Sequence, residues 1–243
     1  MQTKHAKRII FLWSVPRSVS TAFEKMMAHS NCFNVVSEPF IDIYKKSIIS
    51  KQDFEIAQRE FHGKCQLLIE QSDERPVFVK DMAYHALPFL TDEFLNLVHN
   101  TFLIRDPHLS IPSLYKMRAE YSEDQTGFEG QYKLFKKIQD ITGERPLVID
   151  SENLTRDPES IVPSYFQHIG YKMPNDVLSW PPGAREEWAD RETWHVEAIN
   201  SRGFVMQPNA IDYSKLPKKV LKSIERNMVF YEQMKNHIFT LNP

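Results

Sequence analysis

A short segment near the amino end combines hydroxyl and guanidinium groups in a way that could bind an anion. Residues 13–27 read WSVPRSVSTAFEKMM, so Arg17 stands beside Ser18, Ser20 and Thr21. If a helix begins here, its first backbone N–H groups lack partners and carry the positive end of the helix dipole. The segment therefore predicts a site for a compact tetrahedral anion. The alternative is that Ser18 only caps the helix and Arg17 is a solvated charge.

This segment is not one of the two common nucleotide-binding loops. A Walker A loop and a Rossmann fingerprint both need glycines, so that backbone N–H groups can wrap around a phosphate. The first glycine of the chain is Gly63, far beyond the segment. Any anion held here must be bound by the helix start and by side chains.

A second candidate anchor follows in residues 102–115 (FLIRDPHLSIPSLY). Arg105 ends an apolar run, and Ser113 lies eight positions later, about two helical turns along the next element. The carboxyl ends of parallel strands line one edge of a sheet, so Arg105 and Arg17 should face the same crevice. Two cations on one edge favour a ligand with two anionic ends.

Strands alternating with helices would position these residues. Short apolar runs predict strands at residues 8–13, 33–36, 76–80, 101–104 and 147–150. Helical patterns occupy residues 18–28, 53–71, 91–98, 105–121, 128–142, 157–170 and 217–238. The alternation predicts an α/β fold, a three-layer sandwich around a mostly parallel sheet. We expect a single domain over residues 1–243, in which residues 174–243 form a mainly helical part packed on the core, with Trp180, Trp188 and Trp194 as anchors.

Composition argues against several classes of protein. Lys and Arg total 30 against 32 Asp and Glu, a net charge of -2, so no global basic field favours nucleic acid or a membrane surface. The apolar run at residues 9–13 is too short for a signal peptide, and nothing is long enough to span a bilayer. Cys32 and Cys65 have neither zinc nor redox spacing. We expect a cytoplasmic protein, a monomer or homodimer, that acts on a small molecule and uses no metal.

The two anion motifs, in this order, resemble those of sulfotransferases that use 3′-phosphoadenosine 5′-phosphosulfate (PAPS). The family's P-[KR]-S-G-T-T loop, which binds the 5′-phosphosulfate, is matched by residues 16–21 (PRSVST). Its R-x7-S motif, which holds the 3′-phosphate, is matched by Arg105 and Ser113. The resemblance covers about residues 9–170 and is nearest to protein-tyrosine and some bacterial sulfotransferases. It implies the P-loop-like sulfotransferase fold.

The resemblance also implies which residues bind PAPS. The co-substrate would contact Arg17, Ser18, Val19, Ser20, Thr21, Arg105 and Ser113. Residues 201–203 (SRG) partly match the family's R-K-G loop, which adds Arg202 and Gly203 to the residues that would bind PAPS. Val19 replaces the family's glycine, so we expect it to have an ordinary negative φ in the first helical turn, with its side chain turned away from the anion.

The implied reaction moves the sulfuryl group of PAPS to a hydroxyl or amine by in-line displacement. Arg17 would stabilise the leaving 5′-phosphate, and Lys80, at the end of its strand, would be a second cation at the sulfuryl group. Cytosolic members carry a catalytic histidine where this chain has Met82. As general base we rank Glu38 first, presented on an extended turn by the proline that follows it, then His85, then Asp81.

Two other functions remain open at this point. One is a P-loop-like phosphotransferase that uses ATP. The other is a protein that binds the nucleotide without turnover. His195 could touch substrate or the rim of the co-substrate site, although a lone histidine is more often structural.

Overall fold

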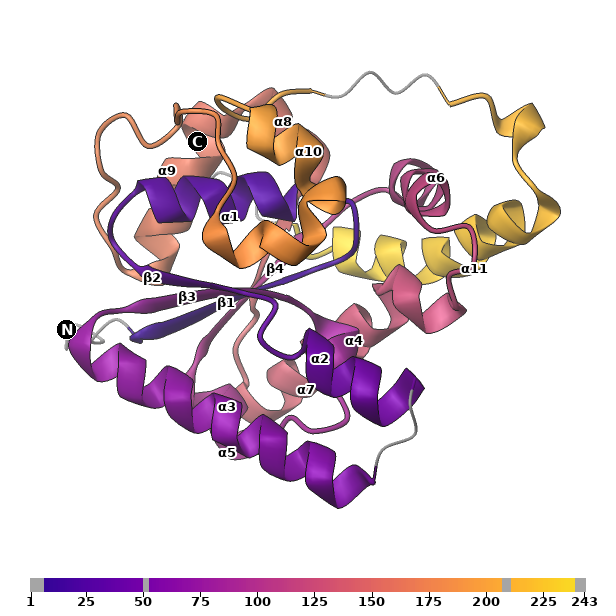
Figure 1. Cartoon of the computed structure of the whole chain (residues 1–243). Helices are drawn as coiled ribbons and strands as arrows, with labels where there is room; N and C mark the ends of the chain where they lie inside the picture. The colour runs from indigo at the N-terminus through magenta and orange to yellow at the C-terminus, as the bar shows by residue number, and fades with distance from the viewer. Residues whose placement is uncertain (1–6, 50–52, 207–210, 239–243) are drawn as a thin grey trace.

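The computed structural model describes residues 7–49, 53–206 and 211–238, and its centre is a parallel sheet (Figure 1). The sheet has five strands in the order β2-β3-β1-β4-β5, and each pairing is parallel. They are β1 (Ile9–Ser14), β2 (Asn34–Ser37), β3 (Val77–Met82), β4 (His99–Ile104) and β5 (Leu147–Asp150). The α/β prediction is confirmed, and each predicted strand lies within two residues of an observed one.

Helices connect the strands and cover both faces of the sheet. The longer ones are α1 (Ser20–His29), α3 (Phe54–Glu74), α6 (Pro107–Met117), α7 (Phe128–Thr142), α9 (Pro158–Ile169), α10 (Glu192–Asn200) and α11 (Lys218–Lys235). The short ones are α2 (Ile41–Tyr44), α4 (Ala83–Ala86), α5 (Asp92–Leu97), α8 (Ser151–Arg156) and the turns η1 (Lys45–Ile49), η2 (Glu123–Thr126), η3 (Glu186–Arg191) and η4 (Tyr213–Lys215). In Figure 1, α1, α9 and α10 lie on one side of the sheet, and α3, α5 and α7 on the other.

The central strand β1 explains why there are two apolar cores. All six of its residues are buried, and successive side chains of a strand point to opposite faces. Phe11 and Trp13 join the core that includes α3, α5 and α7. Ile10 and Leu12 join the core under α1 and α9. The strand is therefore fixed from both sides, and so is the loop that leaves its carboxyl end.

Two helix boundaries differ from the prediction. The first helix begins at Ser20 because Arg17 and Val19 have left-handed backbones, which a helix cannot include. The helix after β4 ends at Met117 rather than near residue 121. It ends there because the next residue, Arg118, has an extended backbone (φ -146°, ψ 95°), which a helix cannot include.

The described part of the late segment is helical over η3, α10, η4 and α11, whereas residues 174–185 are irregular. Trp180 and Trp188 are buried core anchors, as predicted, whereas Trp194 is only half-buried. α10 lies against α1, and α11 against α6 and α7. Residues 207–210 and 239–243 of this segment lie outside the described residues. Among the helices that are described, none combines the length and the hydropathy needed to cross a bilayer.

Candidate active site

The carboxyl ends of β1 to β4 open onto a cavity of about 470 Å³. Its wall includes most of the residues that the sequence singled out, namely Arg17, Ser18, Val19, Ser20, Thr21, Glu38, His85, Arg105 and Gly203. Lys80, Ser113 and Arg202 are not part of the wall, although Lys80 and Ser113 contact residues that are. One sheet edge thus brings together residues separated by up to 186 positions in the chain.

The loop between β1 and α1 has an alternating backbone that suits anion binding. Arg17 has φ 60° and Val19 has φ 62°, whereas Ser18 between them has a negative φ. Alternating right- and left-handed residues turn consecutive N–H groups toward one point. The predicted negative φ of Val19 is therefore wrong, because the loop keeps the turn that glycine makes in the family motif even though a β-branched residue stands there. The Val19 side chain both borders the cavity and packs on the core under α1.

The carbonyl groups of this loop are held by side chains from neighbouring elements. Ser18 Oγ donates to the Val15 carbonyl (2.6 Å), and Ser110 Oγ donates to the Pro16 carbonyl (2.9 Å). Arg105 Nη1 donates to the Arg17 carbonyl (2.5 Å), and Ser151 Oγ donates to the Ser18 carbonyl (2.7 Å). Within the described residues, no backbone carbonyl accepts from the N–H groups of residues 18–21. The Ser18 hydroxyl makes no cap, because it donates to a carbonyl. The loop is thus held with its acceptors occupied and its donors unpaired.

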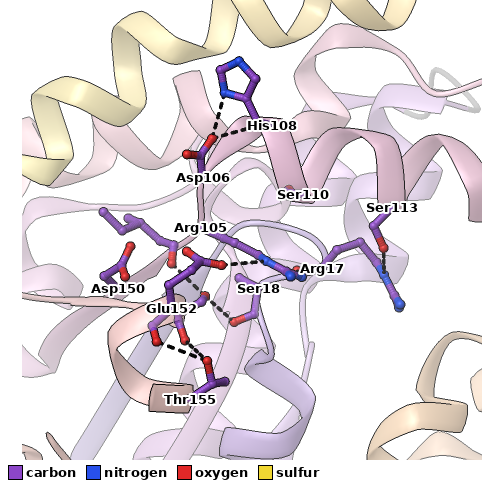
Figure 2. A network of polar contacts seen from close by, with 12 residues as sticks. Arg17, Ser18, Arg105, Asp106, His108, Ser110, Ser113, Asp150, Glu152 and Thr155 are labelled. Carbon is purple, nitrogen blue, oxygen red and sulfur yellow. Dashed lines mark hydrogen bonds and ion pairs between the residues drawn. The ribbon is translucent and has the colours of Figure 1, made fainter. Parts of the chain in front are cut away.

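Arg17 is held in place by both sides of the cavity. Its Nε donates to Ser113 Oγ (3.0 Å), its Nη1 to the Trp194 carbonyl (3.0 Å), and its Nη2 pairs with Glu197 (3.3 Å). Figure 2 shows the contact with Ser113. Burial lowers the pKa of Arg17, Glu197 opposes this, and Arg105 adds to it, so the two guanidinium groups feel each other's charge. Arg17 is not a solvated charge, and the Ser113 hydroxyl lies beside Arg17.

Arg105 forms an ion pair with Glu152, a residue that the sequence analysis missed. Its Nε contacts Glu152 Oε1 at 3.2 Å (Figure 2). Burial and the nearby Asp150 raise the pKa of Glu152, and its Oε2 is buried without a hydrogen-bond partner among the described residues. Glu152 is the second residue after the end of β5, so the sheet-edge rule that selected Arg105 could have found it.

Lys80 and Glu38 form a buried ion pair next to the cavity. Lys80 Nζ is 2.6 Å from Glu38 and 3.3 Å from Glu24, and both Lys80 and Glu24 are fully buried. Burial alone lowers the pKa of Lys80, but the two carboxylates outweigh it and the pKa is raised. Glu38 has φ 44°, so the expected extended turn is wrong. Its N–H donates to the Lys80 carbonyl, which fixes this left-handed turn at the end of β2.

His85 and Asp81 form a second buried pair at the cavity. Asp81 accepts from the N–H groups of Phe40 (3.0 Å) and Met82 (2.7 Å), and His85 Nδ1 lies 2.6 Å from Asp81 Oδ1. Because this carboxylate already accepts two backbone hydrogen bonds, Nδ1 is the donor to it and Nε2 is the basic nitrogen. Asp81 therefore positions His85.

The helix α10 covers the anion loop from the other side. His195 Nδ1 lies 3.2 Å from Thr21 Oγ1, and the Trp194 carbonyl and Glu197 contact Arg17. Lys25 donates from α1 to the carbonyls of Ala198 (2.8 Å) and Ile199 (3.0 Å) near the carboxyl end of α10. Sequence analysis missed Glu197 and Lys25, because nothing in the pattern says that α10 lies against α1.

A parallel sheet with an anion-binding loop after its central strand is the architecture of the P-loop-like sulfotransferase fold. The solved sulfotransferase domain of the Synechococcus PCC 7002 olefin synthase aligns over 96% of both chains with a TM-score of 0.54 and 17% identity. The sulfotransferase domain of the curacin biosynthetic pathway aligns over 95% of this chain and 98% of its own, with a TM-score of 0.53 and 18% identity. At such identities the likeness shows the fold.

The chain belongs to the sulfotransferase domain family, whose pattern it matches over residues 8–238. The curated protein called branched-chain-amino-acid aminotransferase-like protein 2, from Arabidopsis thaliana, is 24% identical over 203 residues. The match covers 81% of this chain but 36% of that relative, so the chain spans only part of the relative's length. Family and fold together support sulfuryl transfer as the general chemistry.

Proposed function

We propose that the protein transfers the sulfuryl group of PAPS to a hydroxyl or amine of a small acceptor. The observation that carries the proposal is the anion loop, which has its carbonyls occupied and its N–H groups unpaired and shares a cavity with two arginines. Arg17 would bind the 5′-phosphosulfate together with residues 18–21, and Arg105, after the next strand, would bind the 3′-phosphate. Gly203 borders the same cavity, whereas Arg202 is exposed beside it.

In the proposed reaction, a bond forms between sulfur and the acceptor atom while the bond from sulfur to the 5′-phosphate oxygen breaks. The acceptor's proton must go to a base, and negative charge develops on the leaving phosphate. Arg17 would neutralise that charge, because a guanidinium stays protonated and can donate two parallel hydrogen bonds. The Arg17 contact with Glu197 would have to be exchanged for contacts with the donor.

For the base, the geometry favours His85 over our first choice, Glu38. Lys80 lies 2.6 Å from Glu38, and such an ion pair weakens a carboxylate as a base. Asp81 instead accepts from Nδ1 of His85 and fixes the tautomer whose Nε2 can accept a proton. In this scheme the Lys80–Glu38 pair positions the edge of β2 and β3, and its two charges cancel.

The donor assignment is tested by thermal stabilisation with 3′,5′-adenosine bisphosphate (PAP), the product of PAPS, against ATP with Mg²⁺. Ligand at about 100 times its Kd stabilises the folded state by about 2.7 kcal/mol, a Tm rise of roughly 5–10 °C for a chain of this size. We expect this rise with PAP, and a PAP affinity at least about tenfold lower in Arg105→Gln. The matched control is Arg226→Gln, an exposed arginine of α11 paired with Glu129.

Three results would overturn the assignment. They are no Tm rise with PAP, a larger rise with ATP and Mg²⁺ than with PAP, and unchanged PAP affinity in a folded Arg105→Gln variant. Folding of the variants is checked by far-ultraviolet circular dichroism.

Catalysis is tested by incubating the protein with PAPS and an acceptor library, then recording products heavier by one sulfuryl group. With an acceptor in hand, His85→Gln should keep PAP affinity and lose roughly 10²-fold or more in kcat. If Glu38→Gln loses that much while His85→Gln retains activity, the base is Glu38. A PAP-binding protein with no product from any acceptor would indicate binding without turnover.

A further inference from the structure

The cavity has two sides, and the order of the strands separates them. The anion loop follows β1, and Arg105 follows β4 on one side of it. On the other side β3 and β2 end, followed by His85 and Glu38. A donor that reaches from the loop to Arg105 leaves the side at β3 and β2 for the acceptor. This division rests on the donor assignment proposed above.

The acceptor side has apolar and aromatic walls. Ile41, Met82 and Tyr84 line it, from α2, the end of β3 and α4. The ring centroid of Tyr84 is 4.3 Å from that of His85, at an interplanar angle of 67°. An acceptor with an apolar or aromatic body would thus reach the proposed base along these side chains.

Most charges that line the cavity are already neutralised in pairs. Arg17 pairs with Glu197, Arg105 with Glu152, and Glu38 with the buried Lys80. Among the described residues, the one carboxylate that pairs with Lys45 is Asp42, at an exposed contact of 3.5 Å. An exposed pair of this kind contributes little and exchanges readily for another anion.

Arg118 stands apart from these pairs. It follows the last residue of α6, is exposed at the cavity wall, and has no carboxylate partner among the described residues. Its guanidinium carbon lies 5.5 Å from the centre of the ring of Trp194, a residue of α10. This cation–π contact holds the Arg118 side chain against α10. Burial and the charge of Glu38 raise the pKa of Tyr84, and Arg118 opposes this rise, so Arg118 acts on the acceptor side.

From this arrangement we infer that the acceptor carries an anionic group, which Arg118 binds at the cavity mouth with help from Lys45. The acceptor would then be an apolar or aromatic body with a hydroxyl or amine at one end and a carboxylate or phosphate at the other. A guanidinium suits such a group because it can donate two parallel hydrogen bonds to it. The inference names a substrate class for the proposed function.

The test is calorimetric titration of the PAP-loaded protein with matched probes. The probes are para-hydroxyphenylacetate and para-hydroxyphenylpropanoate, the amide of each, and the phosphonate analogue of the first. We expect at least one anionic probe to bind about tenfold more tightly than its neutral amide, the value of one charged hydrogen bond. The carboxylate and phosphonate arms identify which anion is preferred.

Variants then assign the effect to Arg118. Arg118→Gln should reduce the preference for the anion to about twofold or less while PAP affinity stays unchanged, and Lys45→Gln should reduce it partly. The control Arg226→Gln should leave it intact. The inference is overturned if no anionic probe binds better than its amide, if the preference survives in Arg118→Gln, or if Arg118→Gln weakens PAP binding. Failure of PAP itself to bind the wild type would instead count against the proposed function.

Discussion

At the scale of single residues, backbone strain is concentrated around the cavity. Among the described residues, five other than glycine have a positive φ, and three of them, Arg17, Val19 and Glu38, line the cavity. A left-handed conformation costs about 1–2 kcal/mol for a residue with a β-carbon, and it persists only where the surroundings fix it. The hydrogen bonds to the loop carbonyls and the bond from Glu38 N–H to Lys80 provide those surroundings.

Replacing Val19 by glycine should therefore be almost neutral. The variant loses the packing of a partly buried side chain but also the strain of φ 62°, so we expect the free energy of unfolding to change by less than about 1 kcal/mol. PAP affinity should be retained. The control is Val36→Gly on β2, also partly buried but without positive φ, which should lose clearly more stability in urea denaturation. Equal losses in the two variants would contradict the strain argument.

Removing the charge of Glu197 should strengthen donor binding. Its carboxylate pairs with Arg17 at 3.3 Å and competes with any anion for that guanidinium. Because the Glu197 side chain is 65% exposed, the effect should be modest, and we expect PAP affinity to rise about two- to fivefold in Glu197→Gln. Titration calorimetry at low salt measures it. A drop in affinity would mean that Glu197 helps to hold the donor site instead.

At the scale of elements, one buried carboxylate joins the sheet edge to the late segment. Glu24 of α1 accepts from Ser37 Oγ (2.9 Å) and Trp188 Nε1 (2.8 Å) and pairs with Lys80 (3.3 Å) and Arg185 (3.5 Å). One side chain thus links α1, β2, β3 and η3 beneath the cavity. A fully buried charge keeps its place only when its partners remain.

Glu24→Gln should accordingly be among the most destabilising single changes in the chain. It leaves the buried Lys80 with one carboxylate and Arg185 without its buried partner, and we expect a loss of about 3–5 kcal/mol in the free energy of unfolding. Chemical denaturation measures this loss. Glu129→Gln, which breaks exposed contacts with Lys133 and Arg226, is the control and should lose less than about 1 kcal/mol. A similar loss in both variants would contradict the network.

At the scale of the whole molecule, buried acids should make stability fall at high pH. Burial raises the pKa of Cys65 from 9.0 to about 12, and it also raises the pKa values of Tyr165 and Tyr231 above 10.0. Above their ordinary pKa values the unfolded chain releases protons that the folded chain retains, so the free energy of unfolding decreases with pH. The ion pairs of Lys80 act in the same direction. They raise the pKa of Lys80 in the folded chain, so their contribution to the free energy of unfolding is lost as the pH rises through that pKa.

Urea midpoints measured from pH 8 to pH 11 should therefore fall from roughly pH 9 upward. Tyr165→Phe removes one buried hydroxyl that titrates in the unfolded chain. Above pH 10 the free energy of unfolding of this variant should therefore decrease by about 1.4 kcal/mol less per pH unit. An exposed tyrosine, Tyr213→Phe, is the control and should change the slope less. A stability that stays flat up to pH 11 would contradict the assignment.

Local sequence patterns were enough to predict the parallel α/β architecture, the loop that follows β1 and the second arginine at the same sheet edge. These follow from local pattern, because buried strands read as apolar runs and parallel strands must present their carboxyl ends together. Helix α7 and strand β5 were predicted to the residue, since Gly143 ends the one and the other is a short, wholly buried run.

Which charged side chains meet depends on tertiary packing. The left-handed backbone of Val19 is imposed by side chains from α6, from α8 and from Arg105 after β4, so its own β-branched propensity predicted the wrong conformation. The pairing of Lys80 with Glu24 and Glu38, the Asp81–His85 pair and the covering of Arg17 by α10 all join residues of different elements or loops. Such contacts depend on how the helices pack across the sheet. A hydrophobic pattern predicts which face of a helix packs against the sheet, but not which residues then meet.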